Sequence, residues 1–116
     1  MKILLILSDP PYGTEKMYNG LRLAATVAKK DGAELKVFLL GDSASGAHNG
    51  QKVPAGYYNI QTMIGALVRK GIKIGVCGTC MDARGLTDAN LLEGAHRSTM
   101  DELAEWTVDA DKVITF

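Results

Sequence analysis

The chain has 116 residues, of which 47% are hydrophobic and 22% charged, and its 13 Lys and Arg balance its 13 Asp and Glu. This is the size of one compact domain with its own core, and we expect a single domain over residues 1–116. A net charge of zero gives no basis for nucleic-acid binding or for an anionic membrane partner. No apolar run approaches the roughly 20 residues that cross a bilayer. We therefore expect a cytoplasmic protein with no membrane or nucleic-acid partner.

The first 40 residues predict a strand, a helix and a second strand. Residues 2–7 form an apolar run without polar alternation, typical of a parallel strand covered on both faces. After a turn at residues 8–13, we expect Thr14 to cap a helix that ends near Gly32, and residues 33–40 to form the next strand. The apolar positions with helical spacing are Met17, Leu21, Ala24, Ala25 and Ala28.

The middle of the chain predicts a long loop, a helix and a third strand. Residues 41–59 are rich in Gly, Ser, Asn and Pro, and a loop of this length is either a functional lid or disordered. Asn59 is expected to cap a helix that ends at Gly71, and residues 72–76 form the strand that follows. The apolar face of that helix is Ile60, Met63, Ile64, Leu67 and Val68.

The last third predicts smaller elements before a closing helix and strand. Residues 86–94 suggest a short helix, residues 95–97 a brief edge strand, and residues 111–116 a final strand. Ser98, with Asp101 three positions later, resembles a helix cap. The expected buried stripe is Met100, Leu103, Ala104 and Thr107, with Trp106 as a rim residue or an interface anchor. This alternation predicts a parallel or mostly parallel sheet with helices on both faces.

Both cysteines of the chain, Cys77 and Cys80, directly follow the third predicted strand. Open α/β sheets place their sites at this carboxyl end of the strands. A thiol is nucleophilic as the thiolate, and free helix amides or nearby cations lower its pKa. If the chain turns helical after Cys77, the amides of residues 78–80 point at its sulfur, and Arg84 lies one to two turns further on.

Several interpretations of Cys77-x-x-Cys80 compete. A lone cysteine at a strand end is most often a small buried apolar residue, but the second thiol and the glycine-rich turn argue against that. A thioredoxin-like dithiol would follow the first strand of its motif and face a cis-proline. Zinc needs four ligands, and His48 and His96 lie at distant, unpatterned positions. The remaining interpretation is a thiol that accepts sulfur as a persulfide, with a neighbouring thiol that resolves the adduct.

Three segments carry a resemblance that covers the whole chain. They are Cys77-Gly-Thr-Cys80-Met-Asp-Ala-Arg84-Gly85-Leu, Ser8-Asp-Pro-Pro-Tyr-Gly13 and Ala110-Asp-Lys-Val-Ile-Thr-Phe116. Together they resemble small single-domain members of the DsrE/DsrF-like family. The resemblance implies a three-layer α/β/α sandwich around a mostly parallel five-stranded sheet, assembled into trimers or hexamers in bacterial or archaeal cytoplasm. In the sulfur-relay members, the cysteine after the third strand takes up sulfane sulfur and passes it on, and by position that cysteine is Cys77.

We therefore interpret the chain as a sulfur-relay protein, either a sulfurtransferase or a sulfur carrier, with donor and acceptor proteins as partners. Cys77 would carry the persulfide, Cys80 would resolve or assist, and Arg84 would give electrostatic support, or else form a surface ion pair with Asp82. No cofactor or metal is expected. The alternative is a non-catalytic oligomeric scaffold or ligand-binding module, whose pocket would be walled by the turn at residues 10–12 and by Tyr57 and Tyr58.

Overall fold

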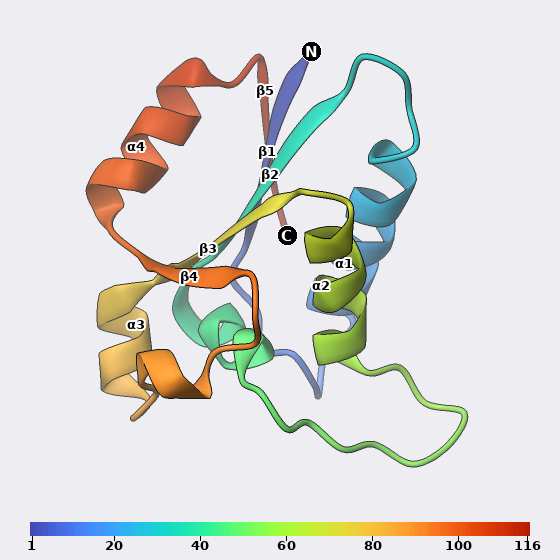
Figure 1. Cartoon of the computed structure of the whole chain (residues 1–116), viewed down its shortest axis with the longest axis vertical. Helices are drawn as coiled ribbons and strands as arrows, with labels where there is room; N and C mark the ends of the chain where they lie inside the picture. Colours follow the sequence, from blue (N-terminus) through green and yellow to red (C-terminus); the bar gives the residue numbers. More distant parts are fainter.

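A computed structural model describes residues 1–116 and contains one sheet of five strands. All strand pairs are parallel, and the spatial order is β4-β3-β2-β1-β5. The strands are β1 (Lys2–Leu7), β2 (Glu34–Leu39), β3 (Lys73–Cys77), β4 (Ala95–Ser98) and β5 (Lys112–Thr115). The expected five-stranded α/β class is confirmed, and the sheet is parallel throughout (Figure 1).

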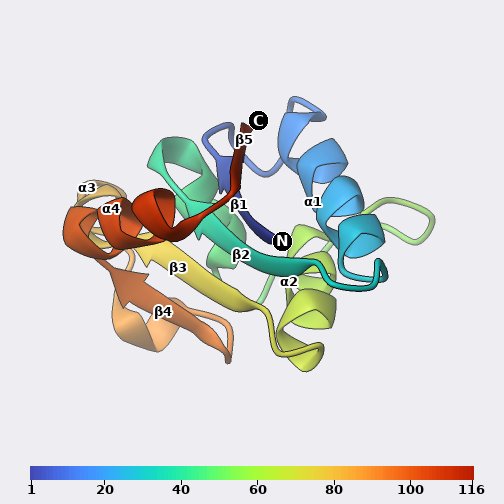
Figure 2. The same cartoon turned by 90° about the horizontal axis from the view of Figure 1, so that it is seen from above.

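Helices cover both faces of the sheet, as Figure 2 shows. One face carries α1 (Lys16–Val27) and α2 (Ile60–Arg69), and the other carries α4 (Met100–Asp109). The short helix α3 (Gly78–Ala83) continues directly from the carboxyl end of β3. Helix α4 then takes the chain from β4 at one edge to β5 at the opposite edge, beside β1. None of the helices is both long and apolar enough to cross a membrane.

The two faces of the sheet bury cores of unequal size. Successive strand side chains point to opposite faces, so Leu5, Val37 and Ile74 pack with α1 and α2 in a cluster of 18 buried residues. The other face has a cluster of five, consisting of Leu4, Phe38, Cys77, Leu103 and Trp106. The side chain of Cys77 therefore belongs to the smaller core, beneath α4.

Trp106 is a core residue, so both sequence-based expectations for it were wrong. It is 7% exposed, and its ring meets Phe38 edge to face with centroids 6.0 Å apart. Gly75 makes room on β3, since a Cβ there would lie 3.2 Å from the indole. The buried stripe predicted for α4 was also partly wrong. Because Leu103 and Trp106 face the sheet, Met100, Ala104 and Thr107 face solvent.

The helix caps were predicted with mixed success. Asn59 caps α2 by accepting a hydrogen bond from the Thr62 backbone N–H at 3.1 Å, as expected. Thr14 does not cap α1, because its hydroxyl donates to the Asp9 carboxylate at 3.1 Å. Helix α4 is capped by Thr99 and not by Ser98, whose hydroxyl donates to Glu102 at 2.6 Å.

Residues 41–59 are more ordered than their composition suggests. They begin with a 3₁₀ helix, η1 (Gly41–Ala47), in which Ser43, Ala44, Gly46 and Ala47 are buried. The Gln51 side-chain amide then donates to the carbonyls of Gly46 and His48 at 2.8 and 2.9 Å. The prediction of a helix over residues 86–94 was wrong, because the structure has only one 3₁₀ turn there, Asp88–Asn90.

Candidate thiol site

Cys77 is both the last residue of β3 and the N-cap of α3. Its Sγ accepts a hydrogen bond from the Cys80 backbone N–H at 3.4 Å and lies 3.4 Å from the Thr79 hydroxyl oxygen. The residue is 7% exposed. The helix expected directly after Cys77 is therefore present. Its first turn places the Cys80 backbone N–H and the Thr79 hydroxyl beside the Cys77 sulfur.

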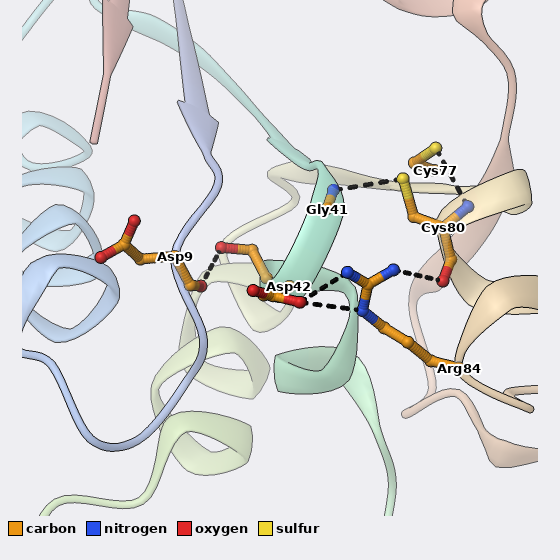
Figure 3. Close-up of polar contacts among 7 residues, drawn as sticks. Asp9, Gly41, Asp42, Cys77, Cys80 and Arg84 are labelled. Atoms are coloured by element: carbon orange, nitrogen blue, oxygen red, sulfur yellow. Dashed lines mark hydrogen bonds and ion pairs between the residues drawn. The ribbon is translucent and has the colours of Figure 1, made fainter.

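Cys80 lies on the same helix but receives its hydrogen bond from another element. Its Sγ accepts from the backbone N–H of Gly41 at 3.2 Å, as Figure 3 shows. Gly41 begins η1 with φ at +58°, a conformation that favours glycine, so the turn after β2 reaches the thiol on α3. Cys80 packs against both hydrophobic clusters and thus lies at the junction between them.

The surroundings move the two thiol pKa values in opposite directions. Burial raises the pKa of Cys77, but hydrogen bonds from the Cys80 thiol, the Thr79 hydroxyl and the backbone N–H groups of both residues together lower it below its ordinary value. Burial, followed by the hydrogen bond with Cys77, raises the pKa of Cys80. The first thiolate to form in this pair is thus that of Cys77.

Arg84 forms an ion pair, though not with Asp82 as the sequence suggested. Its Nη2 and Nε donate to Asp42 at 2.5 and 3.2 Å, and its Nη1 donates to the Cys80 carbonyl at 3.0 Å (Figure 3). Asp82 instead accepts two hydrogen bonds from Arg97 on β4, at 2.9 and 2.8 Å. Helix α3 is therefore fixed to η1 on one side and to β4 on the other.

A pocket of about 220 Å³ opens beside Cys77, and Cys80 and Arg84 do not line it. Its lining residues are Cys77, Gly78, Thr79, Arg97, Ser98, Thr99 and Met100. The sequence did not predict that the junction of β4 and α4 belongs to the site, because this depends on which strand lies beside β3. Ser98 is the register partner of Cys77 in the parallel pair, so residues 97–100 reach the same edge of the sheet.

The other candidate residues lie outside this pocket. His48 contacts the carbonyl of Asn49, and His96 contacts Glu102. No three His, Cys, Asp or Glu side chains are grouped closely enough to hold a metal ion. Tyr12 and Tyr58 stack with ring centroids 5.8 Å apart.

Fold and site together define an α/β protein in which a Cys-x-x-Cys turn follows the third strand of a five-stranded parallel sheet. Residues 1–116 match the sequence model of the DsrE/DsrF-like family, and the chain belongs to that family. It is 39% identical to protein YchN of Escherichia coli K12, over 99% of this chain and 98% of YchN. It is also 36% identical to the uncharacterized protein MJ0989 of Methanocaldococcus jannaschii, over the full length of both.

Solved structures agree with this assignment. The crystal structure of YchN from E. coli superposes with a TM-score of 0.92 at 40% identity, over 99% of this chain and 98% of YchN. A protein of unknown function from Methanobacterium thermoautotrophicum, MTH1491, shares the fold with a TM-score of 0.75 at 13% identity, over 99% of this chain and 98% of its own. The family resemblance and the fold predicted from the sequence are both confirmed.

The opposite pKa shifts predict unequal reactivity of the two thiols. We expect iodoacetamide at neutral pH to alkylate Cys77 faster than Cys80, because alkylation follows the thiolate fraction. The rate at Cys77 should rise at lower pH than that of a free cysteine, since its pKa is lowered. Both thiols lie on one tryptic peptide, residues 74–84, so fragmentation of that peptide in the mass spectrometer is needed to resolve the two sites. Labelling in denaturant, where both rates should converge, is the control. Equal and slow labelling of both thiols in the native protein would contradict the expectation.

Proposed function

We propose that this protein is a sulfur carrier that holds sulfane sulfur as a persulfide on Cys77. The observation that supports this most is the hydrogen bonding of the Cys77 sulfur to the Cys80 N–H and Thr79 hydroxyl, next to an open pocket. These groups stabilise the Cys77 thiolate, which is the form that attacks a sulfur donor and the form that is restored when the sulfur is passed on. Membership of the DsrE/DsrF-like family supports the same chemistry.

The proposed transfer needs no oxidant. The Cys77 thiolate attacks the outer sulfur of a donor persulfide, R–S–SH, so that a new sulfur–sulfur bond forms, the donor bond breaks, and R–S⁻ leaves. An acceptor thiolate then takes the outer sulfur from Cys77 in the same way and leaves the Cys77 thiolate behind. The exchange requires a sulfur donor and a sulfur acceptor, and the acceptor is either a protein or a small thiol.

Cys80 offers a second way to unload the sulfur. Its thiolate attacks the Cys77 sulfur of the persulfide, which forms a Cys77–Cys80 disulfide and expels HS⁻. Two external thiols then reduce the disulfide and are themselves oxidised to one disulfide. The raised pKa of Cys80 slows this step, because less of its thiolate is present at neutral pH.

Mass spectrometry after incubation with a sulfane-sulfur donor tests the proposal. We expect the Cys77 peptide to gain about 32 Da for each added sulfur. Cys77→Ser should abolish the gain, and Cys80→Ser should retain it. A protein that gains no sulfur on Cys77 would favour the alternative, a non-catalytic scaffold or ligand-binding protein of the same fold.

The Cys80→Ser variant also tests the role of the second thiol. We expect it still to load sulfur on Cys77, because serine keeps a hydroxyl donor in place of the Cys80 thiol. It should release sulfur to an excess of a small thiol about tenfold more slowly, because the route through Cys80 is closed. The released hydrosulfide is measured against time. An unchanged release rate would leave Cys80 with a packing role only.

We also propose that the protein is a homo-oligomer, either a trimer or a hexamer. The exposed face of α4 supports this, because Met100 and Val108 are 63% and 88% exposed and lie in one row with Ala104. Methionine and other apolar residues are characteristic of subunit interfaces. Light scattering across a dilution series should give a multiple of the 12.4 kDa chain mass, which Val108→Asp should reduce. A mass near 12.4 kDa at micromolar concentration would contradict the proposal.

A further inference from the structure

The pocket beside Cys77 is lined mostly by polar residues and carries a positive charge. Its seven lining residues include one cation, Arg97, together with the hydroxyls of Thr79, Ser98 and Thr99, and no carboxylate. Its volume of about 220 Å³ lies below the roughly 300 Å³ at which sites for drug-sized ligands begin. The pocket therefore suits a small ligand, with the cation Arg97 and the hydroxyls of Thr79 and Thr99 in its lining, whereas the Ser98 hydroxyl already donates to Glu102.

Arg97 is held beside the first turn of α3 by two features. Its Nη1 and Nη2 donate to Asp82, which fixes the guanidinium, while its Nε–H has no acceptor within the protein. Gly78 provides the space, because a Cβ there would lie 3.0 Å from Nε and 3.1 Å from Cζ. The guanidinium thus rests against the residue that follows Cys77.

Each guanidinium nitrogen of Arg84, the cation favoured by the sequence, already donates one hydrogen bond. Its Nε and Nη2 donate to Asp42, and its Nη1 donates to the carbonyl of Cys80. It also lies outside the lining of the pocket. Of the two arginines near the thiols, Arg97 is the one that can meet a ligand at Cys77.

We propose that Arg97 makes this pocket a binding site for small carboxylate-bearing thiols and persulfides, and that these are the low-molecular-weight sulfur donors or acceptors of Cys77. The assignment of Cys77 as the reacting thiol rests on the proposed function, whereas the preference for anions does not. A guanidinium recognises a carboxylate by charge and by directed N–H donors. Asp82 orients Arg97 and partly neutralises it, so the preference is moderate.

Two alkylating reagents of nearly equal size test the preference without any sulfur chemistry. Iodoacetate carries a carboxylate and iodoacetamide is neutral. The rate constant of iodoacetate at Cys77 is divided by that of iodoacetamide, and the result is divided by the same quotient for a small free thiol. This normalised ratio reports on charge in the pocket. We expect Arg97→Gln to lower this ratio about fivefold, the effect of one unit charge at close range in a water-like medium. Arg97→Lys should restore much of the ratio, and Asp82→Asn should raise it about two- to fivefold.

Arg69→Gln is the matched control, because it removes one exposed arginine from α2 on the opposite face of the sheet. It should leave the ratio within about twofold of wild type, since separated surface charges are screened by salt. A ratio that is unchanged in Arg97→Gln, or lowered equally in Arg69→Gln, would overturn the proposal.

A pair of donors then tests the substrate class. The persulfide of N-acetylcysteine carries a carboxylate, and the persulfide of N-acetylcysteine amide does not. With each rate normalised to loading of a small free thiol, we expect Cys77 to load about fivefold faster from the carboxylate form, and Arg97→Gln to remove the difference.

The outcomes separate the two proposals. Equal loading from both donors in the wild type would overturn the substrate class and leave the sulfur-carrier function standing. Loading from neither donor would overturn the function, whereas an alkylation ratio that still depends on Arg97 would support the anion site.

Discussion

Trp106→Ala is expected to lower the free energy of unfolding by about 3–5 kcal/mol, the usual cost of truncating a large buried aromatic side chain. The indole is the largest side chain in the five-residue cluster beneath α4, and it packs edge to face on Phe38. Lys36 also lies over its ring, with its Nζ 5.3 Å from the centroid. Since domains of this size are stable by roughly 5–15 kcal/mol, the variant should be close to unfolding.

Denaturant titration at a fixed protein concentration measures this change. Glu105→Ala is the control on the same helix, because Glu105 is exposed and forms no ion pair or hydrogen bond, and it should change the stability by less than about 0.5 kcal/mol. A loss below about 1 kcal/mol for Trp106→Ala would show that the indole is not part of the core.

Gly78→Ala and Gly65→Ala should change stability in opposite directions, although both replace a glycine in a helix. At Gly78 a Cβ would lie 2.9 Å from the Ser98 carbonyl oxygen and 3.0 Å from the Nε of Arg97. Helix α3 must then move away from β4, and we expect a loss of about 1–3 kcal/mol. At Gly65 the nearest atom is the flexible end of Arg69 at 3.5 Å, so alanine should stabilise the protein by about 0.5–1 kcal/mol.

The Gly78 variant has a second expected effect, on the thiol itself. Movement of α3 changes the hydrogen bonds that the Cys77 sulfur receives, so its alkylation rate at neutral pH should fall toward that of a free cysteine. Gly65→Ala should leave that rate unchanged, because α2 lies on the far side of the sheet. Equal changes of stability in both variants would mean that the space between α3 and β4 can take a Cβ at residue 78.

The sequence predicted the elements that depend on local patterns. Apolar runs marked the strands, and the spacing of Ile60, Ile64 and Leu67 marked α2, because periodicity reflects which face is buried. The 3₁₀ helix η1 was not predicted, because small residues such as Ser43 and Gly46 are typical of loops in a sequence, and only the packing in the fold shows that they are buried. Thr99 caps α4 in place of the predicted Ser98, and the sequence could not separate them because both residue types are common N-caps.

The sequence predicted some features of the thiol site and not others. The placement of Cys77 and Cys80 after the third strand could be predicted, because strand order along the chain fixes which turn meets the carboxyl edge. The partners of Arg84 and Asp82 could not, because Asp42 and Arg97 lie 42 and 15 residues away in the sequence. Such pairs depend on which strands are neighbours, and a single sequence does not state that order.

The unequal cores also bear on how the sulfur could reach a partner as large as a protein. Regions with few buried apolar contacts open locally at a lower cost than the whole fold. Helix α4 rests on the cluster of five, whereas α1 and α2 rest on the cluster of 18. A brief lifting of α4 would therefore uncover Cys77 while the sheet and its opposite layer stay folded. Access for a macromolecular acceptor then depends on the opening rate of one helix and requires no permanent channel.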